Sequence, residues 1–163
     1  MAWFDCKTGS RKYYIPNLRI LIGVSVHRYI KGARSERELI NTLYEKEYSV
    51  MRSAGSGVNS LSPDIIAFKS GKGFAFECKA WNKDRLAIEP DKFEVLKKWE
   101  SNTGMDTMIA WRMNGKGWFF IKLDEMKKTA KSYSVTKKSA LEINRRIGFM
   151  PGLDDMQSFA LKA

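Results

Sequence analysis

The segment 62–81, SPDIIAFKSGKGFAFECKAW, constrains the fold more than any other part of the chain. Two apolar runs flank the turn-forming sequence Lys-Ser-Gly-Lys-Gly, so we expect a β-hairpin with strands at about 64–68 and 74–79. Successive side chains of a strand point to opposite faces, which places Phe74 and Phe76 together on one face. That face is apolar enough to be buried.

Charged residues stand at the ends of both expected strands. Asp64 begins the first strand, and Glu77 and Lys79 share one face at the end of the second. If the turn centres on Ser70 and Gly71, Asp64 lies opposite Glu77, where cross-strand Cβ atoms are ~5 Å apart. Two carboxylates and one ammonium therefore converge at one point.

A third acid comes from the segment 34–47, which we expect to be a helix. Ser35 and Glu38 fit a capping box at its start. Its apolar stripe consists of Leu39, Ile40, Leu43 and Tyr44. Glu36 lies on this stripe, so its carboxylate is expected to face the sheet. The alternative is a first-turn acid that stays in water and is favoured by the helix dipole. Because two more acids stand on the hairpin, we favour the inward orientation.

The other periodic segments complete a pattern of alternating helices and strands. They predict a strand at 48–52, a loop at 53–62 and a helix at 91–102 between Pro90 and Gly104. Two strands at 107–113 and 118–123 and a late helix at 139–147 follow. The order predicts an α/β fold with a mixed central β-sheet flanked by helices. Residues 17–30 have no clean period, and their state is left open.

The converging acids indicate a hard-cation site. The chain has one histidine, His27, and two cysteines, which excludes a Cys/His metal cluster. Oxygen ligands favour Mg²⁺, for which Mn²⁺ can substitute. Such a cation activates a bound water and stabilises charge on a phosphate.

Roles for the neighbouring residues follow from this chemistry. Lys79 can orient or activate the water and neutralise transition-state charge. Glu36 can complete the metal shell or hold a coordinated water. The set predicts a phosphodiester hydrolase. On its own the acidic spacing is weak, because a surface Asp, a strand-end Glu and an exposed Lys would give the same pattern.

The net charge of +11 predicts a polyanionic partner. Residues 1–33 carry six Lys/Arg against one acid, and residues 126–163 carry eight against three. The stretch between them carries fifteen against fourteen, so the excess lies at the two ends. Basic ends contact phosphates without reading base sequence, and the alternative is that they are merely solvated.

The apolar run 20–26 is too short to cross a bilayer, which takes about 20 residues. No signal peptide is recognisable, and we expect no membrane association and a cytoplasmic location.

Four motifs in order resemble the archaeal Holliday junction resolvases of the Hjc type. They are KGARSERELI at 31–40, VMRSAGS at 50–56, PDIIA at 63–67 and FECKA at 76–80. The resemblance covers about 31–123. It implies the restriction-endonuclease-like core of the PD-(D/E)xK nucleases, and a homodimer that cuts symmetric strands of a four-way DNA junction. Recognition would then depend on junction shape and phosphates.

The resemblance also assigns residues to roles. It implies catalytic and metal-binding acids at Glu36, Asp64 and Glu77, and a catalytic lysine at Lys79. The functional serine of a mobile loop is matched by Ser56, with Ser53 as the alternative. The DNA contacts that we expect beside the site are Arg37, Arg52, Lys31, Arg34 and Ser53.

The domain organisation follows from the same comparison. We expect a nuclease core at 31–125 and a basic C-terminal extension of the same domain at 126–163. Residues 1–30 are read as an N-terminal extension. No methionine lies between positions 1 and 51, so we hypothesise that translation starts at a codon other than AUG, for instance at Val24 or Val26. Mass spectrometry of the native protein tests this.

The sequence thus predicts a magnesium-dependent endonuclease that resolves Holliday junctions in recombination and repair. One alternative is a restriction-type or repair nuclease on the same fold, and another is a non-catalytic junction-binding protein. Which other recombination proteins it meets is left open. We expect Trp81 to be a packing residue and Lys92 to be a solvated lysine at a helix start. Trp111, Trp118 and Phe119 are expected in the core or at a dimer surface.

Overall fold

A computed structural model describes residues 2–5, 10–13, 19–53 and 61–147, and it gives side-chain surroundings only from Gly32 onward. The chain divides into two compact units, residues 1–31 and 32–163. In the first, β1 (Ala2–Asp5) and β2 (Ser10–Tyr13) pair as an antiparallel hairpin. The predicted domain limits and the hypothesis about residues 1–30 stay predictions.

The first helix, α1, spans Arg19–Glu45 and is 27 residues long. The predicted helix start at residue 34 and its capping box are therefore wrong. Ser35 is only 5% exposed, and its hydroxyl donates to the carbonyl of Gly32 at 2.8 Å. A serine inside a helix satisfies its hydroxyl on the preceding turn in this way, so Ser35 imitates a cap without being one.

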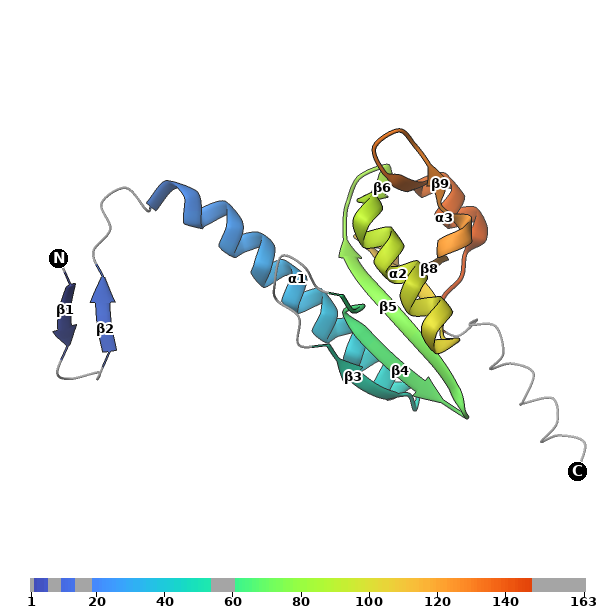
Figure 1. Ribbon diagram of the computed structural model, residues 1–163, viewed down its shortest axis with the longest axis horizontal. Coiled ribbons are helices and arrows are strands. Elements are labelled where there is room, and N and C mark those ends of the chain that lie inside the picture. The colour runs from blue at the N-terminus through green and yellow to red at the C-terminus, as the bar shows by residue number, and fades with distance from the viewer. Residues whose placement is uncertain (1, 6–9, 14–18, 54–60, 148–163) are drawn as a thin grey trace, which may run out of the picture. The chain divides into compact units, whose positions relative to one another are not determined.

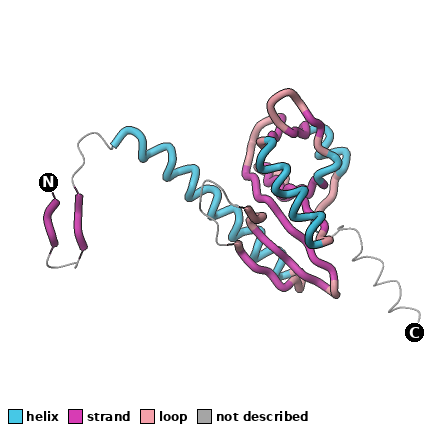
Figure 2. The backbone as a smooth tube through the Cα atoms, in the orientation of Figure 1, coloured by secondary structure: helices cyan, strands magenta, loops and turns pink. Residues whose placement is uncertain are grey.

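The second unit is built on a five-stranded sheet in the order β3-β4-β5-β7-β8 (Figures 1 and 2). Neighbours pair antiparallel except β5 and β7, which pair parallel. The sheet is therefore mixed, as predicted. The strands are β3 (Ser49–Arg52), β4 (Ile65–Lys69), β5 (Lys72–Ala80), β7 (Asp106–Met113) and β8 (Gly117–Lys122).

The β4–β5 hairpin turns at Ser70 and Gly71, as the sequence indicated. Lys69 pairs with Lys72, and both intervening residues have positive φ, 50° and 77°. Two left-handed residues in a two-residue turn match the right-handed twist of the paired strands. This register decides what lies opposite the acids further along the hairpin.

Each face of the sheet carries its own core. On one face, Phe74 and Phe76 of β5 pack with Leu39 and Leu43 of α1. Tyr44, which was assigned to the same stripe, is 75% exposed, so that assignment is wrong.

The other face holds the second helix, α2 (Pro90–Thr103), whose Phe93 and Leu96 pack on Ile109 and Trp111 of β7. Figure 1 shows this helix lying along the sheet. Pro90 stands at its first turn, and Gly104 ends it in a left-handed conformation with φ 66°, as predicted.

A second, three-stranded sheet was not expected from the sequence. It pairs β6 with β10 and β10 with β9, all antiparallel. Its strands are β6 (Arg85–Ile88), β9 (Lys127–Lys128) and β10 (Tyr133–Thr136). The short helix α3 (Lys137–Ile143) follows, and a 3₁₀ turn (Leu123–Glu125) precedes β9. Val135 and Ala140 join the same core as α2, so these late elements are part of the packed unit.

None of the helices in the described residues is long and apolar enough to cross a membrane.

Candidate active site

Asp64 is held where β4 begins, directly against the strand that carries Glu77. Its carboxylate Oδ2 accepts the backbone N–H of Cys78 at 2.8 Å. Its own carbonyl accepts the N–H of Ser53 at 2.9 Å. The pairing of Ile65 with Phe76, continued by one residue, sets Asp64 opposite Glu77. The predicted convergence of these two acids is therefore confirmed by the register.

The pKa of Asp64 is raised from 3.8 to about 6. Burial is the largest cause, and the negative charge of Glu77 is the second. The N–H of Cys78 and the ammonium of Lys79 act in the opposite direction but do not outweigh them. Perturbed pKa values cluster at functional sites, where burial and neighbouring like charges are combined in this way.

Glu77 is a buried charge with two lysine partners. It is 3% exposed, and its Oε1 accepts a hydrogen bond from Nζ of Lys79 at 2.7 Å. Burial acts to lower the pKa of Lys79, but the charge of Glu77 and this hydrogen bond outweigh it and raise the pKa above its ordinary 10.5. Lys79 therefore keeps its positive charge in the site.

The second partner of Glu77 is Lys92, for which the sequence predicts a solvated position. Nζ of Lys92 lies 3.0 Å from Oε2 of Glu77 and donates to the carbonyl of Ser62 at 3.0 Å. The prediction of a solvated helix-start lysine is wrong. Lys92 stands four residues before the buried Leu96, so it lies on the same helix face, and this spacing could have indicated its direction.

Glu36 is half-buried on α1 and pairs with Arg52 of β3. Nε and Nη2 of Arg52 lie 2.8 Å and 2.7 Å from Oε2 of Glu36. Because α1 begins at Arg19, Glu36 is a mid-helix residue, and the alternative of a frayed first-turn acid is wrong. Its charge adds to the raised pKa of Asp64, which makes it an electrostatic neighbour of the site.

The donor set suits a hard divalent cation, although its ligands are not gathered as a trio. In the described residues, no group of three His, Cys, Asp or Glu is close enough to hold a metal ion. Among those same residues, buried Oε2 of Glu77 has a charge contact with Lys92 but no donor in hydrogen-bonding geometry. A hard divalent cation prefers oxygen ligands. At this place it would coordinate the carboxylate oxygen that lacks a donor and reduce the repulsion between the two carboxylates. The joint metal set of Glu36, Asp64 and Glu77 stays a prediction.

Only some of the residues that are expected to contact DNA are described beside the candidate site. Arg34 and Arg37 are exposed on α1, and Arg52 is 54% exposed beside Glu36. Ser53 hydrogen-bonds Ser62 at 2.6 Å between their hydroxyl oxygens. Ser56 and the side chain of Lys31 lie outside the described residues.

Two aromatic predictions have different outcomes. The core assignment of Trp111, Trp118 and Phe119 is confirmed, since they are 0%, 6% and 0% exposed. Trp81 is 39% exposed, with Nζ of Lys83 5.0 Å from its ring centroid, so it is not one of the buried core residues. Its backbone carbonyl accepts Nε1–H of the buried Trp111.

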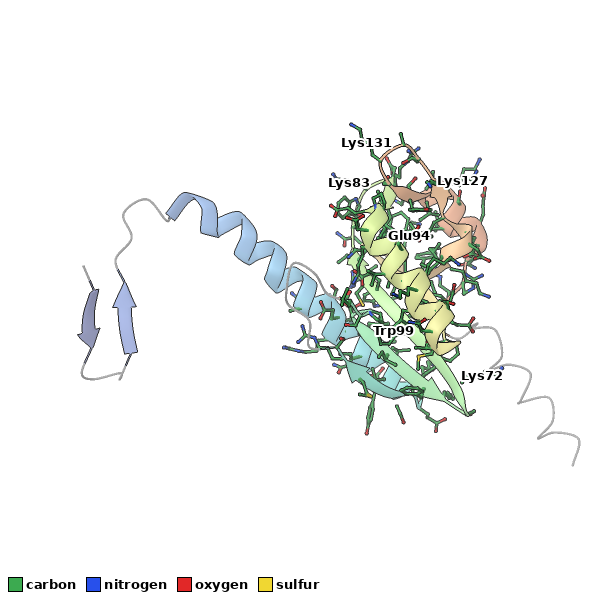
Figure 3. All side chains as sticks on the ribbon, viewed as in Figure 1. Lys72, Lys83, Glu94, Trp99, Lys127 and Lys131 are labelled. Carbon is green, nitrogen blue, oxygen red and sulfur yellow. The ribbon has the colours of Figure 1, made fainter. Side chains whose placement is uncertain are left out.

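Lysines stand at both ends of the second unit. Figure 3 shows Lys72 at the β4–β5 turn and Lys83, Lys127 and Lys131 at the opposite end. Whether these lysines contact phosphates stays a prediction.

An acid before one strand, an acid and a lysine on the next, and a mixed sheet between helices form the arrangement that the sequence motifs predict. The family model described as "Archaeal holliday junction resolvase (hjc)" matches residues 27–151. The chain belongs to this family, as the motifs indicated.

Individual relatives agree with the family assignment. The chain is 29% identical over 106 residues to the crossover junction endodeoxyribonuclease Hjc of Archaeoglobus fulgidus, covering 64% of this chain and 78% of the relative. It is 36% identical over 91 residues to the Hjc of Methanocaldococcus jannaschii, covering 55% and 65%. The solved structure of Archaeoglobus fulgidus Hjc, a Holliday junction resolvase, superposes with a TM-score of 0.66 at 24% identity, covering 72% of this chain and 93% of that one. The structural likeness supports the fold.

Proposed function

We propose that this protein is a divalent-cation-dependent endonuclease that resolves four-way DNA junctions in recombination and repair. One observation carries the proposal. Asp64, Glu77 and Lys79 converge at the end of one hairpin, in a chain of the resolvase family. The relatives' names, crossover junction endodeoxyribonuclease, supply the substrate.

The roles of the residues follow from their contacts. Asp64 and Glu77 would hold Mg²⁺, with Mn²⁺ as a substitute, and Glu36 would complete the set. The ammonium of Lys79, fixed at 2.7 Å from Glu77, would neutralise charge that builds on the phosphate. The chemistry that the bound cation supplies is activation of water and Lewis-acid stabilisation of the phosphate.

The DNA contacts are proposed on charge and exposure. Arg34 and Arg37 are exposed on α1, the helix that carries Glu36, and Arg52 of β3 pairs with Glu36. Lys31 and Ser53 are retained as candidate DNA contacts, and Ser56 as the candidate catalytic serine. Contacts of this kind position a backbone without reading bases, which suits a structure-specific enzyme.

A homodimer and a cytoplasmic location complete the proposal. A four-way junction is two-fold symmetric, and paired nicks need two active sites, so a two-fold dimer is the simplest assembly. Sedimentation velocity of the full chain with and without a junction tests this, and a monomer on the junction would contradict it.

The proposed function is tested by comparing substrates. The protein is incubated with Mg²⁺ and either a synthetic four-way junction or a linear duplex with the same arm sequence. We expect paired, symmetric nicks on the junction alone. Cutting of the duplex at a fixed sequence would support a restriction-type enzyme, and junction binding without cutting would support an architectural protein. Either result would overturn the proposal.

A further inference from the structure

Lys92 connects three parts of the site that are distant in sequence. From the first turn of α2, its Nζ lies 3.0 Å from Oε2 of Glu77 on β5. The same nitrogen donates at 3.0 Å to the carbonyl of Ser62, two residues before Asp64. One ammonium therefore bridges the catalytic strand and the segment that leads into the other acid.

The buried carboxylate of Glu77 needs positively charged partners. The side chain of Glu77 is 4% exposed, and Asp64 is its negatively charged neighbour. Lys79 contacts Oε1 at 2.7 Å and Lys92 contacts Oε2 at 3.0 Å, so each carboxylate oxygen faces one ammonium. A buried carboxylate beside a second acid is strongly destabilising unless it is paired.

The two lysine contacts differ in kind. Lys79 makes a hydrogen bond to Oε1, whereas Lys92 makes a charge contact outside hydrogen-bond geometry, so among the described residues Oε2 has no hydrogen-bond donor. Lys92 instead donates its hydrogen bond to the backbone carbonyl of Ser62. The contact with Oε2 is thus the more easily exchanged of the two.

We propose that Lys92 is a positioning residue that occupies Oε2 of Glu77 as a placeholder until a divalent cation binds. Nζ of Lys92 lies 3.0 Å from Oε2, so a divalent cation that coordinates this oxygen brings a second positive charge close to the ammonium, and the two positive charges repel each other. Lys92 therefore leaves Oε2 on loading while Lys79 keeps Oε1. This inference rests on the proposed cation dependence of the site.

A purely structural anchor makes a different prediction. If Lys92 only ties α2 to Ser62 and Glu77, its loss weakens the fold equally with and without the cation. A placeholder stabilises the cation-free protein and competes with the cation. Its loss therefore lowers stability without the cation but raises the affinity for the cation.

The test uses the full chain and the substitution Lys92→Gln. Thermal unfolding is followed in EDTA and across a Mg²⁺ titration, and the affinity for Mg²⁺ is measured by calorimetry without DNA. We expect a lower midpoint in EDTA, a larger rise in midpoint with Mg²⁺ than for the wild type, and Mg²⁺ binding tighter by roughly 10-fold.

Two controls separate charge from shape. Lys98→Gln removes an exposed lysine of the same helix and should leave midpoint and affinity unchanged. Lys92→Arg keeps the charge and should retain the wild-type affinity. In the wild type itself, the ¹³Cε signal of Lys92 should shift on addition of Mg²⁺ while that of Lys98 stays, which needs no destabilised variant.

The outcomes distinguish two failures. If Mg²⁺ binds the wild type but Lys92→Gln binds it equally or more weakly, or if the Lys92 signal does not move, the placeholder is refuted while the nuclease proposal stands. If neither Mg²⁺ nor Mn²⁺ binds or stabilises any of the proteins, the cation dependence itself is refuted, and the placeholder with it.

Discussion

Cys78 donates its backbone N–H to Oδ2 of Asp64 at 2.8 Å, so one acid of the site is fixed by the strand that carries the other. Glu77 and Lys79 flank Cys78 on β5, and their side chains point to the opposite face from its own. The hairpin therefore sets the spacing of both carboxylates through its register rather than through side-chain packing alone. Any change that shifts the register disassembles the site.

The raised pKa of Asp64 gives the cation-free protein a specific pH dependence. Its carboxyl binds a proton more tightly when folded, with a pKa of about 6 against 3.8. The free energy of unfolding should therefore fall as the pH rises from about 4 to about 6, and stay lower above that range. Asp64→Asn removes this charge and keeps an oxygen for the N–H of Cys78.

Denaturant unfolding in EDTA checks this from pH 4 to 8. At pH 4, Asp64→Asn and the wild type should be about equally stable. Above pH 6.5 the variant should be more stable, by on the order of 2 kcal/mol. A variant that is less stable at every pH would contradict the raised pKa of Asp64, which burial and then the charge of Glu77 produce.

Arg52 is expected to matter for DNA more than for folding. Its pair with Glu36 is exposed on the arginine side, so Arg52→Ala should change the free energy of unfolding by less than about 1 kcal/mol. If Arg52 contacts a phosphate, junction affinity falls, and the slope of log affinity against log salt falls by about 1. Titrations at several salt concentrations measure both, with Lys98→Ala as the control. An unchanged slope would remove Arg52 from the DNA surface.

Arg145, unlike Arg52, is expected to matter for the stability of the fold. Its guanidinium donates to both oxygens of Glu125 at 2.7 Å and 2.8 Å, and also to the carbonyl of Phe120. Arg145→Ala should lower the free energy of unfolding by about 2–3 kcal/mol because it leaves partly buried acceptors unpaired.

A pair of similar chemistry but greater exposure supplies the control for Arg145. Lys138 faces Glu142 at 4.0 Å and its side chain is 88% exposed, so Lys138→Ala should change stability by less than about 0.5 kcal/mol. Equal losses for the two variants in chemical denaturation would contradict the assignment of Arg145.

The parts of the fold that were predictable have local signals. The β4–β5 hairpin, the ends of α2 and the mixed sheet follow from turn chemistry, a Pro start, a Gly stop and apolar periodicity. The start of α1 was not predictable, because Ser35 and Glu38 imitate a cap within a continuous helix. The second sheet was missed since β6 and β10 are four residues each, and Ile88 meets Tyr133 only through tertiary pairing.

The candidate site also has a part that the sequence predicts and a part that it does not. Strand alternation and hairpin register predicted that Asp64, Glu77 and Lys79 would meet, since they lie within one supersecondary unit. The Glu36–Arg52 pair depends on how α1 crosses the sheet, which a spacing rule does not give. Lys92 was misassigned because a helix-start lysine is usually solvated, although its position four residues before Leu96 indicated the buried side.

The central claim is that the Asp64–Glu77–Lys79 cluster cuts the junction. It is tested most directly by comparing wild-type protein with Glu77→Gln on a labelled four-way junction with Mg²⁺, while binding is followed on the same substrate. We predict that paired nicks disappear, with a loss of at least about 100-fold in cutting rate, while junction affinity changes little. A Glu77→Gln protein that still cuts the junction at a rate near the wild type would contradict the account.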